Sequence, residues 1–222
     1  GSAVNQADVS SALASLRGQL SGRALVSGWS HRPLFGVSSA VSANGYAVNY
    51  GYTDGGRLSS ISDADGIKNL YSYHYGGGAS SGNYVESVRR NDMSGGNNAT
   101  SRQYYDGLGR PSQTVDNAVG ASGKTVRTLQ EYDLRGRERR GWLPAVGGAM
   151  GEVSVDEFAR LSASTYCGDA HAYGDRSYDA ADRPLRMSTP GDAWHSAGKG
   201  KTTAYVTNGP DNPVKLYHAA LS

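Results

Sequence analysis

The sequence predicts a mainly β fold, built from antiparallel β-hairpin repeats with one N-terminal α-helix. Its 222 residues include 31 Gly and 15 Tyr but only 2 Phe, so amphipathic tyrosine rings must supply much of the packing bulk. The 22 basic and 20 acidic residues nearly cancel, which argues against a disordered chain. The third observation is a short motif that returns along the chain, as it does in stacked repeats.

The first expected element is a helix over residues 8–20. Apolar residues recur there at helical spacing after Asp8, a candidate N-cap: Val9, Ala12, Leu13, Leu16 and Leu20. Such a helix would cover an end or an edge of the sheet. Residues 1–7 are expected to be a disordered leader that begins with Gly1-Ser2, a pair typical of a cloning scar.

A repeated unit of the form Tyr-Asp-x-x-Gly-Arg accounts for most of the remaining chain. Five copies begin at Tyr52, Tyr105, Tyr132, Val155 and Tyr178. The last four follow one another at steps of 27, 23 and 23 residues, and the longer gap after the first leaves room for one unmarked unit around residues 71–75. The repeat-motif residues are Tyr52, Arg57, Tyr105, Asp106, Gly109, Arg110, Tyr132, Asp133, Gly136, Arg137, Asp156, Arg160, Tyr178, Asp179 and Arg183.

Each copy is expected to form the turn of one hairpin. Asp at the first turn position and Gly three residues later are the preference of a type I turn followed by a left-handed residue. Asp182 replaces that Gly with a residue that tolerates positive φ, and Thr53 replaces the Asp. Ala159 is the poorest substitute, so its turn is expected to be distorted. A period of 23 residues holds two strands and two connections, which is one hairpin per repeat.

The segments between the turns have the residue pattern of strands. Strands are expected at residues 67–75, 124–132, 202–207 and 214–217. The last two would pair as a hairpin through the turn residues 208–213. Flexible connections are expected at 76–82 and 91–99.

The expected organisation has three parts. Residues 1–7 form the leader, residues 8–78 the helix with the first hairpins, and residues 79–222 the repeat sheet. The glycine-rich break near residue 78 need not separate independent domains, so the last two parts can belong to one continuous structure.

No residue is assigned catalytic, cofactor-binding or metal-binding chemistry. The run from Asp63 to Gly66 is similar to the start of a calcium loop, but His74 stands at the twelfth position, where a carboxylate is needed. Cys167 and His171 are too far apart on an extended chain to act as a nucleophile and its base. Cys167 is instead expected to be a small core residue. Three further histidines lack zinc-ligand spacing: His31, His195 and His218.

The composition also bears on possible partners. The sequence pI of about 8.6 comes from scattered arginines and not from a dense basic face, which argues against nucleic acid. No run of about 18 apolar residues is present, so no membrane-spanning segment is expected. Trp142 and Trp194 are the candidate ligand-binding residues of an alternative interpretation, in which the chain is a carbohydrate-binding or adhesion module.

At the repeated motif the sequence resembles the RHS, or YD-repeat, family of very large bacterial proteins. The family's unit is Tyr-Asp-x-x-Gly-Arg-Leu/Pro, and the five copies are similar to it, with departures at Thr53, Val155, Ala159 and Asp182. Residues 32–37 with 50–58, and Trp142-Leu143-Pro144 with 190–194, are similar to RHS proteins of Bacteroidetes type. The resemblance covers roughly residues 8–195 and suggests the N-terminal part of a repeat region.

The resemblance implies a curved or spiralling sheet that, in complete family members, winds into a hollow shell around a cargo. In polymorphic-toxin members that cargo is a C-terminal toxin. The self-cleaving core segment of the family is not evident in this sequence, so a fragment of such a shell is expected.

The expected function is therefore a structural shell or scaffold segment of a secreted or surface RHS-type protein, without enzymatic activity. Its expected partners are other repeats of its own chain, toxin cargo or glycans, and a second copy bound through open sheet edges. The mechanism would be mechanical, because stacked hairpins satisfy one another's backbone groups.

Overall fold

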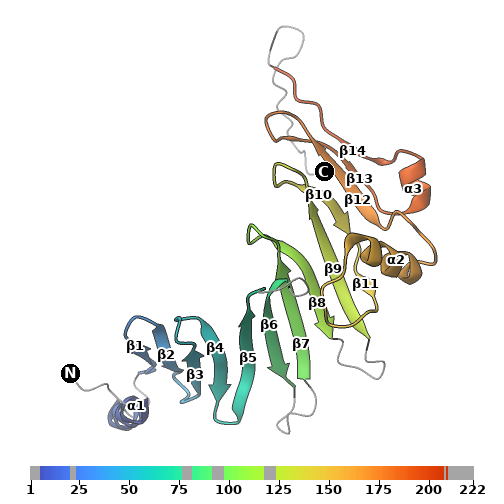
Figure 1. The fold of residues 1–222 in the computed structure, drawn as a ribbon. Helices are drawn as coiled ribbons and strands as arrows, with labels where there is room; N and C mark the ends of the chain where they lie inside the picture. Colours follow the sequence, from blue (N-terminus) through green and yellow to red (C-terminus); the bar gives the residue numbers. More distant parts are fainter. Residues whose placement is uncertain are drawn as a thin grey trace, which may run out of the picture. The chain divides into compact units, whose positions relative to one another are not determined.

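The computed structural model describes residues 6–20, 24–76, 82–91, 98–117, 124–207 and Gly209. Strands dominate this part of the chain (Figure 1). In chain order the elements are α1 (Gln6–Leu20), β1 (Gly28–Arg32), β2 (Gly36–Val41), β3 (Ala47–Tyr52), β4 (Leu58–Asp63), β5 (Gly66–His74), β6 (Asn83–Arg90), β7 (Asn98–Tyr105), β8 (Pro111–Asn117), β9 (Thr125–Tyr132), β10 (Glu138–Trp142), β11 (Ala145–Val146), α2 (Val155–Thr165), β12 (Tyr173–Tyr178), β13 (Pro184–Ser188), α3 (Asp192–Ser196) and β14 (Gly200–Thr202).

Each strand pairs antiparallel with its neighbours, in the order β1 to β10 and then β12, β13 and β14, while β11 pairs with β9. The predicted fold class is therefore confirmed: the protein is mainly β, with antiparallel hairpins and an N-terminal helix. The chain forms two compact units. Unit 1 comprises Gly1–Leu129 and Pro144–Leu161, and unit 2 comprises Gln130–Leu143 and Ser162–Ser222.

The core of unit 1 lies where β7, β8 and β9 meet the segment that leads into α2. Val115, Ala145 and Phe158 have no exposed surface, and Tyr104 is 3% exposed. The Tyr104 hydroxyl donates to the carbonyl oxygen of Met150 at 2.8 Å, which joins the strand to that segment. Strand β9 alternates buried and half-buried residues over its first five positions, as expected for a strand with one covered face.

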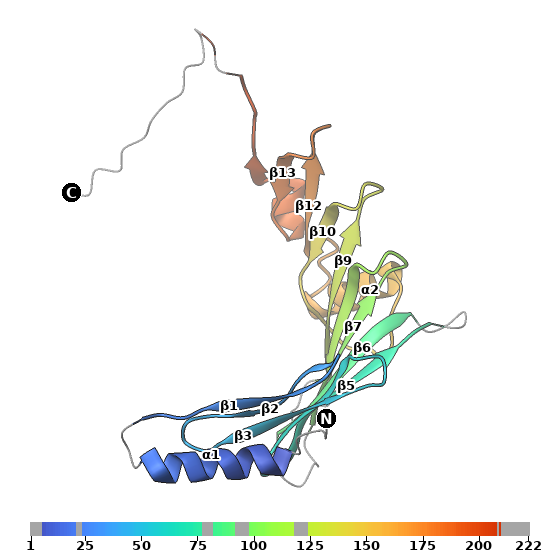
Figure 2. The ribbon, with the colours of Figure 1, turned by 90° about the vertical axis from the view of Figure 1, so that its left-hand side faces the viewer.

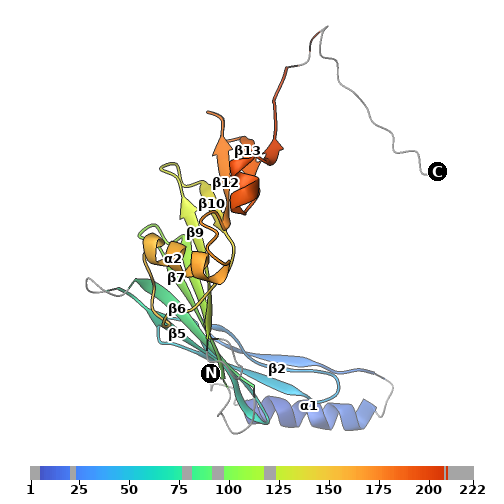
Figure 3. The ribbon, with the colours of Figure 1, turned by 90° about the vertical axis from the view of Figure 1, so that its right-hand side faces the viewer.

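Helix α1 packs on the first strands of unit 1 and runs alongside them (Figures 2 and 3). A Cβ at Gly28 would lie 2.6 Å from a methyl group of Leu13, so the missing side chain lets the helix approach β1. Arg17 donates to the carbonyl oxygens of Val26 and Ser42. The helix starts at Gln6, so Asp8 lies in its first turn and the predicted N-cap is wrong.

The fifth predicted repeat turn is also wrong, because Val155–Thr165 forms helix α2. The Ser154 hydroxyl caps the helix by accepting the Glu157 N–H at 3.2 Å. Phe158 and Ser162 are buried at helical spacing. Ala159 occupies the position at which the hairpin turn requires positive φ. Alanine adopts that conformation only with strain, so the turn does not compete with the helix. Asp156 and Arg160 are exposed helix residues and not turn residues.

The remaining expectations have mixed outcomes. Strands β5 and β9 confirm those predicted at 67–75 and 124–132. Strand β14 ends at Thr202, so a regular strand over 202–207 is wrong, and the strand predicted at 214–217 lies outside the described residues. Strands β5 and β6 pair at six positions across the glycine-rich break near residue 78.

Cys167 is exposed at the end of α2, with φ of 56°, and is not the core residue that was predicted. The Gly168 N–H donates back to the carbonyl oxygen of Ala163 at 2.8 Å, which ends the helix. Within the described residues, no helix combines the length and the apolar character needed to cross a membrane.

Candidate functional site

The repeat motif forms the same turn at four places in the chain. In the turn that begins at Asp106, the Asp106 N–H donates to the Arg110 carbonyl oxygen and the Gly109 N–H donates to the Asp106 carbonyl oxygen, both at 2.9 Å. The turns that begin at Thr53, Asp133 and Asp179 have the same pair of bonds. The fourth residue of each turn has positive φ: Gly56 77°, Gly109 77°, Gly136 83° and Asp182 62°. This is a type I turn closed by a left-handed residue, as the Asp-x-x-Gly spacing predicts.

The aspartate side chain locks each complete turn from inside. The Asp106 Oδ1 atom accepts the N–H groups of Leu108 and Arg110 at 2.9 Å, and Oδ2 accepts the Arg110 Nε–H at 2.7 Å. The turns at Asp133 and Asp179 repeat this pattern with distances between 2.6 and 2.9 Å. One carboxylate thus satisfies two backbone donors and holds the motif arginine in place.

Four tyrosine hydroxyls in the described part of the chain connect a hairpin to the preceding one. In unit 1, Tyr52 donates to the Val37 carbonyl oxygen at 2.6 Å and Tyr73 to that of Leu58 at 2.9 Å. Unit 2 has the same arrangement, in which Tyr178 donates to Glu138 at 2.9 Å and Tyr205 to Pro184 at 3.2 Å. In three of these pairs the acceptor directly follows the motif arginine of the preceding turn. We call this set of hydroxyl contacts the tyrosine ladder.

The motif arginine also faces the next ladder tyrosine. The guanidinium carbon lies 5.1 Å from the ring centre for Arg57 and Tyr73, 4.6 Å for Arg137 and Tyr178, and 4.2 Å for Arg183 and Tyr205. Arg137 and Arg183 therefore contact both the aspartate of their own turn and the neighbouring hairpin, whereas Arg57 has no aspartate because Thr53 stands there. Cation–π contacts of this kind are worth about 0.5–1 kcal/mol at exposed sites.

The sequence reasoning missed two members of this system. Tyr205 is one, although it follows Tyr178 by 27 residues and has a glycine four positions later; Val206 in place of Asp hid it. The other is a turn of the same form at 42–46, where Gly45 has φ of 87° and its N–H donates to the Ser42 carbonyl oxygen. Its signal was the Asn44-Gly45 pair. Tyr73 fills the ladder position in the unmarked unit that the sequence placed around residues 71–75.

Within each unit the motif turns lie at one end of the antiparallel strands. In unit 1 they join β3 to β4 and β7 to β8, so they lie at the same end of the strands (Figure 1). In unit 2 they join β9 to β10 and β12 to β13, again at one common end. Helix α3 belongs to the opposite end of unit 2.

The two candidate ligand tryptophans differ in their surroundings. The Trp142 indole N–H donates to the Glu131 carboxylate at 2.6 Å, and the ring packs on Tyr173 at 4.6 Å between centres. Trp194 on α3 is 55% exposed. Trp142 thus has a packing role in unit 2, and Trp194 is the accessible ring of the pair.

The fold brings two histidines together that the sequence left separate. The His171 and His195 rings stack at 4.0 Å between centres. His171 Nδ1 lies 2.5 Å from Asp192, and His195 Nε2 lies 3.1 Å from Asp175. Among the described residues, no group of three or more His, Cys, Asp or Glu side chains could hold a metal ion.

Removal of one ladder hydroxyl should weaken unit 2 measurably. Tyr178→Phe deletes the bond to the Glu138 carbonyl but keeps the ring over Arg137, so we expect a loss of about 1 kcal/mol in the free energy of unfolding. Urea unfolding measures this loss. Tyr50→Phe is the matched control, because the Tyr50 hydroxyl has no partner among the described residues. Equal effects of the two substitutions would contradict the ladder.

The turn aspartates should make the protein sensitive to acid. The pKa of Asp106, Asp133 and Asp179 is held below its ordinary value by bonds from the backbone and side chain of the arginine four residues later, which outweigh the opposing effect of burial. A lowered folded-state pKa stabilises the protein above the unfolded-state pKa, and the contribution is lost as pH falls through the folded-state value. We therefore expect urea midpoints to fall below about pH 4. The triple Asp→Asn variant should be weaker at neutral pH and show a smaller acid-dependent decrease.

Comparisons with known proteins are consistent with this architecture. Residues 81–207 match the family model described as "Domain of unknown function (DUF6443)". No curated protein matches the sequence. The crystal structure of TcdB2-TccC3-Cdc42 is similar over 74% of this chain, with a TM-score of 0.57 and 11% identity. That of TcdB2-TccC3 without its hypervariable C-terminal region is similar over the same share, with a TM-score of 0.58 and 12% identity. The chain spans 13% of each matched chain, and at these identities the likeness concerns the fold alone.

Proposed function

This chain belongs to the DUF6443 family, and from that membership and the tyrosine ladder we propose that it is a wall segment of a larger RHS-type, or YD-repeat, protein. In this role it is a structural scaffold, and we assign it no catalytic step. We also propose, from the sequence resemblance, that it belongs to the N-terminal part of the repeat region of a Bacteroidetes-type member.

The main support for this proposal is that the contacts of the turn and of the tyrosine ladder can continue from one hairpin to the next. At three places a motif hairpin offers an arginine and the carbonyl that follows it, and a later hairpin supplies a tyrosine that contacts both. Because each of these hairpins supplies the groups that the next hairpin contacts, further hairpins of the same kind can be added to the sheet with the same contacts. This property suits a long wall better than a ligand site.

The likeness to TcdB2-TccC3 supports the same role. One matched structure is described as TcdB2-TccC3 without its hypervariable C-terminal region, so that protein has a variable C-terminal region. We propose that the complete protein containing this chain likewise carries a variable cargo, a C-terminal toxin, and that the wall encloses it. A secreted or surface location follows from such a role.

Electron microscopy of the complete natural protein tests the wall. We expect a hollow shell in which this segment is part of a continuous β-sheet. A solid or extended particle, in which the segment forms a separate domain, would overturn the proposal.

A ladder variant tests whether these contacts maintain the wall. In the complete protein, the pair Tyr73→Phe and Tyr178→Phe should expose the C-terminal segment to added protease, because both deleted hydroxyls connect neighbouring hairpins. The control pair is Tyr50→Phe and Tyr71→Phe, whose hydroxyls have no partner within the described residues. Identical digestion of the two pairs would count against a role for the ladder.

A further inference from the structure

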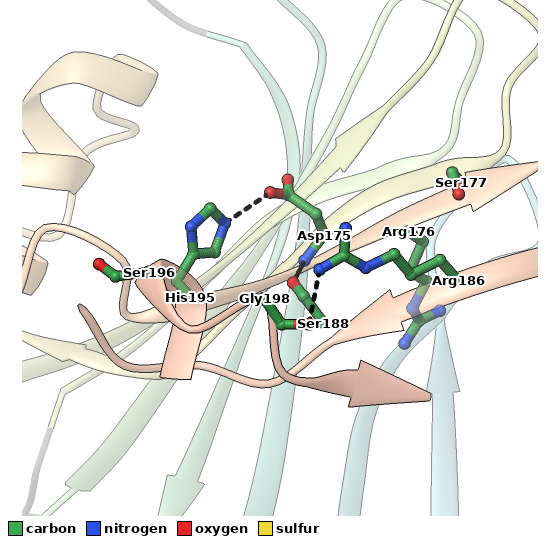
Figure 4. A pocket seen from close by; sticks show the side chains of 8 residues that line it. All are labelled: Asp175, Arg176, Ser177, Arg186, Ser188, His195, Ser196 and Gly198. Atoms are coloured by element: carbon green, nitrogen blue, oxygen red, sulfur yellow. Dashed lines mark hydrogen bonds and ion pairs between the residues drawn. The ribbon is translucent and has the colours of Figure 1, made fainter. Parts of the chain in front are cut away.

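Unit 2 contains a pocket, lined mainly by charged and polar residues, that the wall role does not use. It measures about 340 Å³ and lies between α3 and the strands β12 and β13 (Figure 4). Its lining side chains are Asp175, Ser177, Arg186, Ser188, His195 and Ser196, together with Arg176, which is paired with Glu138. This volume is at the small end of the range for ligand pockets, so it suits a small molecule or one side chain of a partner.

The wall of this pocket is held in place by contacts between its own elements. His195 of α3 bonds to Asp175 of β12, and the Asp175 N–H donates to the Ser188 hydroxyl at 2.7 Å. The Gly191 N–H, just before α3, donates to the His171 carbonyl oxygen at 2.8 Å. The pocket is therefore largely formed before any ligand arrives, which lowers the entropic cost of binding.

The acidic group of the pocket is already paired. Asp175 accepts bonds from Arg140 at 3.1 Å and from His195 at 3.1 Å. Burial raises the pKa of Asp175, but these two bonds outweigh it and keep the carboxyl below its ordinary pKa. Asp175 is thus an ion-paired carboxylate that contributes little net negative charge to the pocket.

Arg186 is the basic group that lacks a counter-ion. Its Nη2 atom donates to the Gly198 carbonyl oxygen at 3.1 Å, which positions the guanidinium in the pocket (Figure 4). No carboxylate pairs with it anywhere in the described part of the chain. Lys199 and Lys201, which follow Gly198, also have no carboxylate partner among the described residues. The free donors of a guanidinium fit a carboxylate in a two-bond fork.

We propose that this pocket is a carboxylate-binding site, in which Arg186 receives the carboxylate of a small acid or of a glutamate side chain. The hydroxyls of Ser177 and Ser196, at the two ends of the pocket, have no partner among the described residues and bind the other polar groups of the ligand. This proposed site is separate from the wall role, so a negative binding result would leave the proposed wall role unchanged.

Calorimetric titration of the intact chain tests the site, with succinate and with a capped Gly-Glu-Gly peptide as separate probes. We expect saturable binding of at least one of them, and the one that binds identifies whether the carboxylate comes from a free acid or a polypeptide. The neutral succinamide should not bind. Arg186→Gln should weaken binding by about tenfold or more, and Arg186→Lys, which keeps the charge without the fork, should also weaken it.

The matched control is Arg90→Gln, which removes the same charge from an exposed position in unit 1. It should leave binding unchanged. Near-ultraviolet circular dichroism and thermal unfolding of each variant confirm that the fold is retained. Failure of both carboxylate probes to bind, equal binding of succinamide, or equal weakening by Arg90→Gln and Arg186→Gln would each overturn the proposal.

Discussion

Substitution of Arg127 by methionine is expected to lower the free energy of unfolding by about 3–5 kcal/mol. The Arg127 side chain has no exposed surface. It donates to the carbonyl oxygens of Gly147 at 3.1 Å, Ala149 at 2.5 Å and Gly151 at 3.2 Å, and to the Gln113 side-chain oxygen at 3.1 Å. Methionine fills similar space but leaves these buried acceptors without donors.

Arg127 holds the connection from β11 to α2 against the sheet of unit 1. Burial lowers the pKa of Arg127 from its ordinary value, which reflects the cost of placing a charge there. Arg127→Lys should be intermediate, because an ammonium group cannot reach all four acceptors at once. Arg90→Met is the exposed control, with an expected effect within about 0.5 kcal/mol. A loss below about 1 kcal/mol for Arg127→Met in urea unfolding would contradict the buried network.

Phe158→Ala is expected to cost about 3–5 kcal/mol, because the ring is fully buried in unit 1 and its removal leaves a cavity. This substitution also distinguishes two structures of the same segment. In helix α2 the ring faces the core, whereas in the repeat turn predicted from sequence it would lie at an exposed turn tip. Urea unfolding of the variant measures the difference.

Arg160→Ala is the companion of this experiment. The Arg160 side chain is 74% exposed, and its contacts among the described residues are with its own helix, the Glu157 carboxylate and the Asp156 carbonyl oxygen, so the expected effect is within about 0.5 kcal/mol. Small effects of both substitutions would favour the turn, and a large effect of Arg160→Ala alone would contradict the helix.

The motif turns were predictable because their stabilising contacts are local. The carboxylate of Asp106 bonds to atoms two and four residues later, and the positive φ of Gly109 is a property that glycine adopts without strain. All the information needed for such a turn lies within about six residues. The same reason explains why Asp182 could replace glycine at the equivalent position.

The segment at 155–161 shows where local pattern fails. Its sequence is similar to the motif, but Ala159 stands in place of the glycine that would close the turn. In the helix the Phe158 ring is buried in the core, which is more favourable than exposure at a turn. The sequence contained an opposing signal, a capping serine followed by acidic residues, which is typical of a helix start.

The candidate sites depended on contacts between distant residues. His171 and Asp192 are 21 residues apart, and Tyr178 lies 40 residues after its acceptor at Glu138 because α2 intervenes. Spacing along the chain cannot reveal such pairs. The buried position of Arg127 was hidden for the same reason, since an arginine on a strand is usually exposed.

The amino-acid order alone determined the hairpin period, the turn type and the N-terminal helix, because each depends on residues that are close in the chain. Only the folded structure decided that tyrosine hydroxyls join successive hairpins, that one motif copy is a helix, and that Arg186 stands in a pocket without a counter-ion. These outcomes depend on which distant groups the packed unit brings into contact, and no short stretch of sequence contains that information.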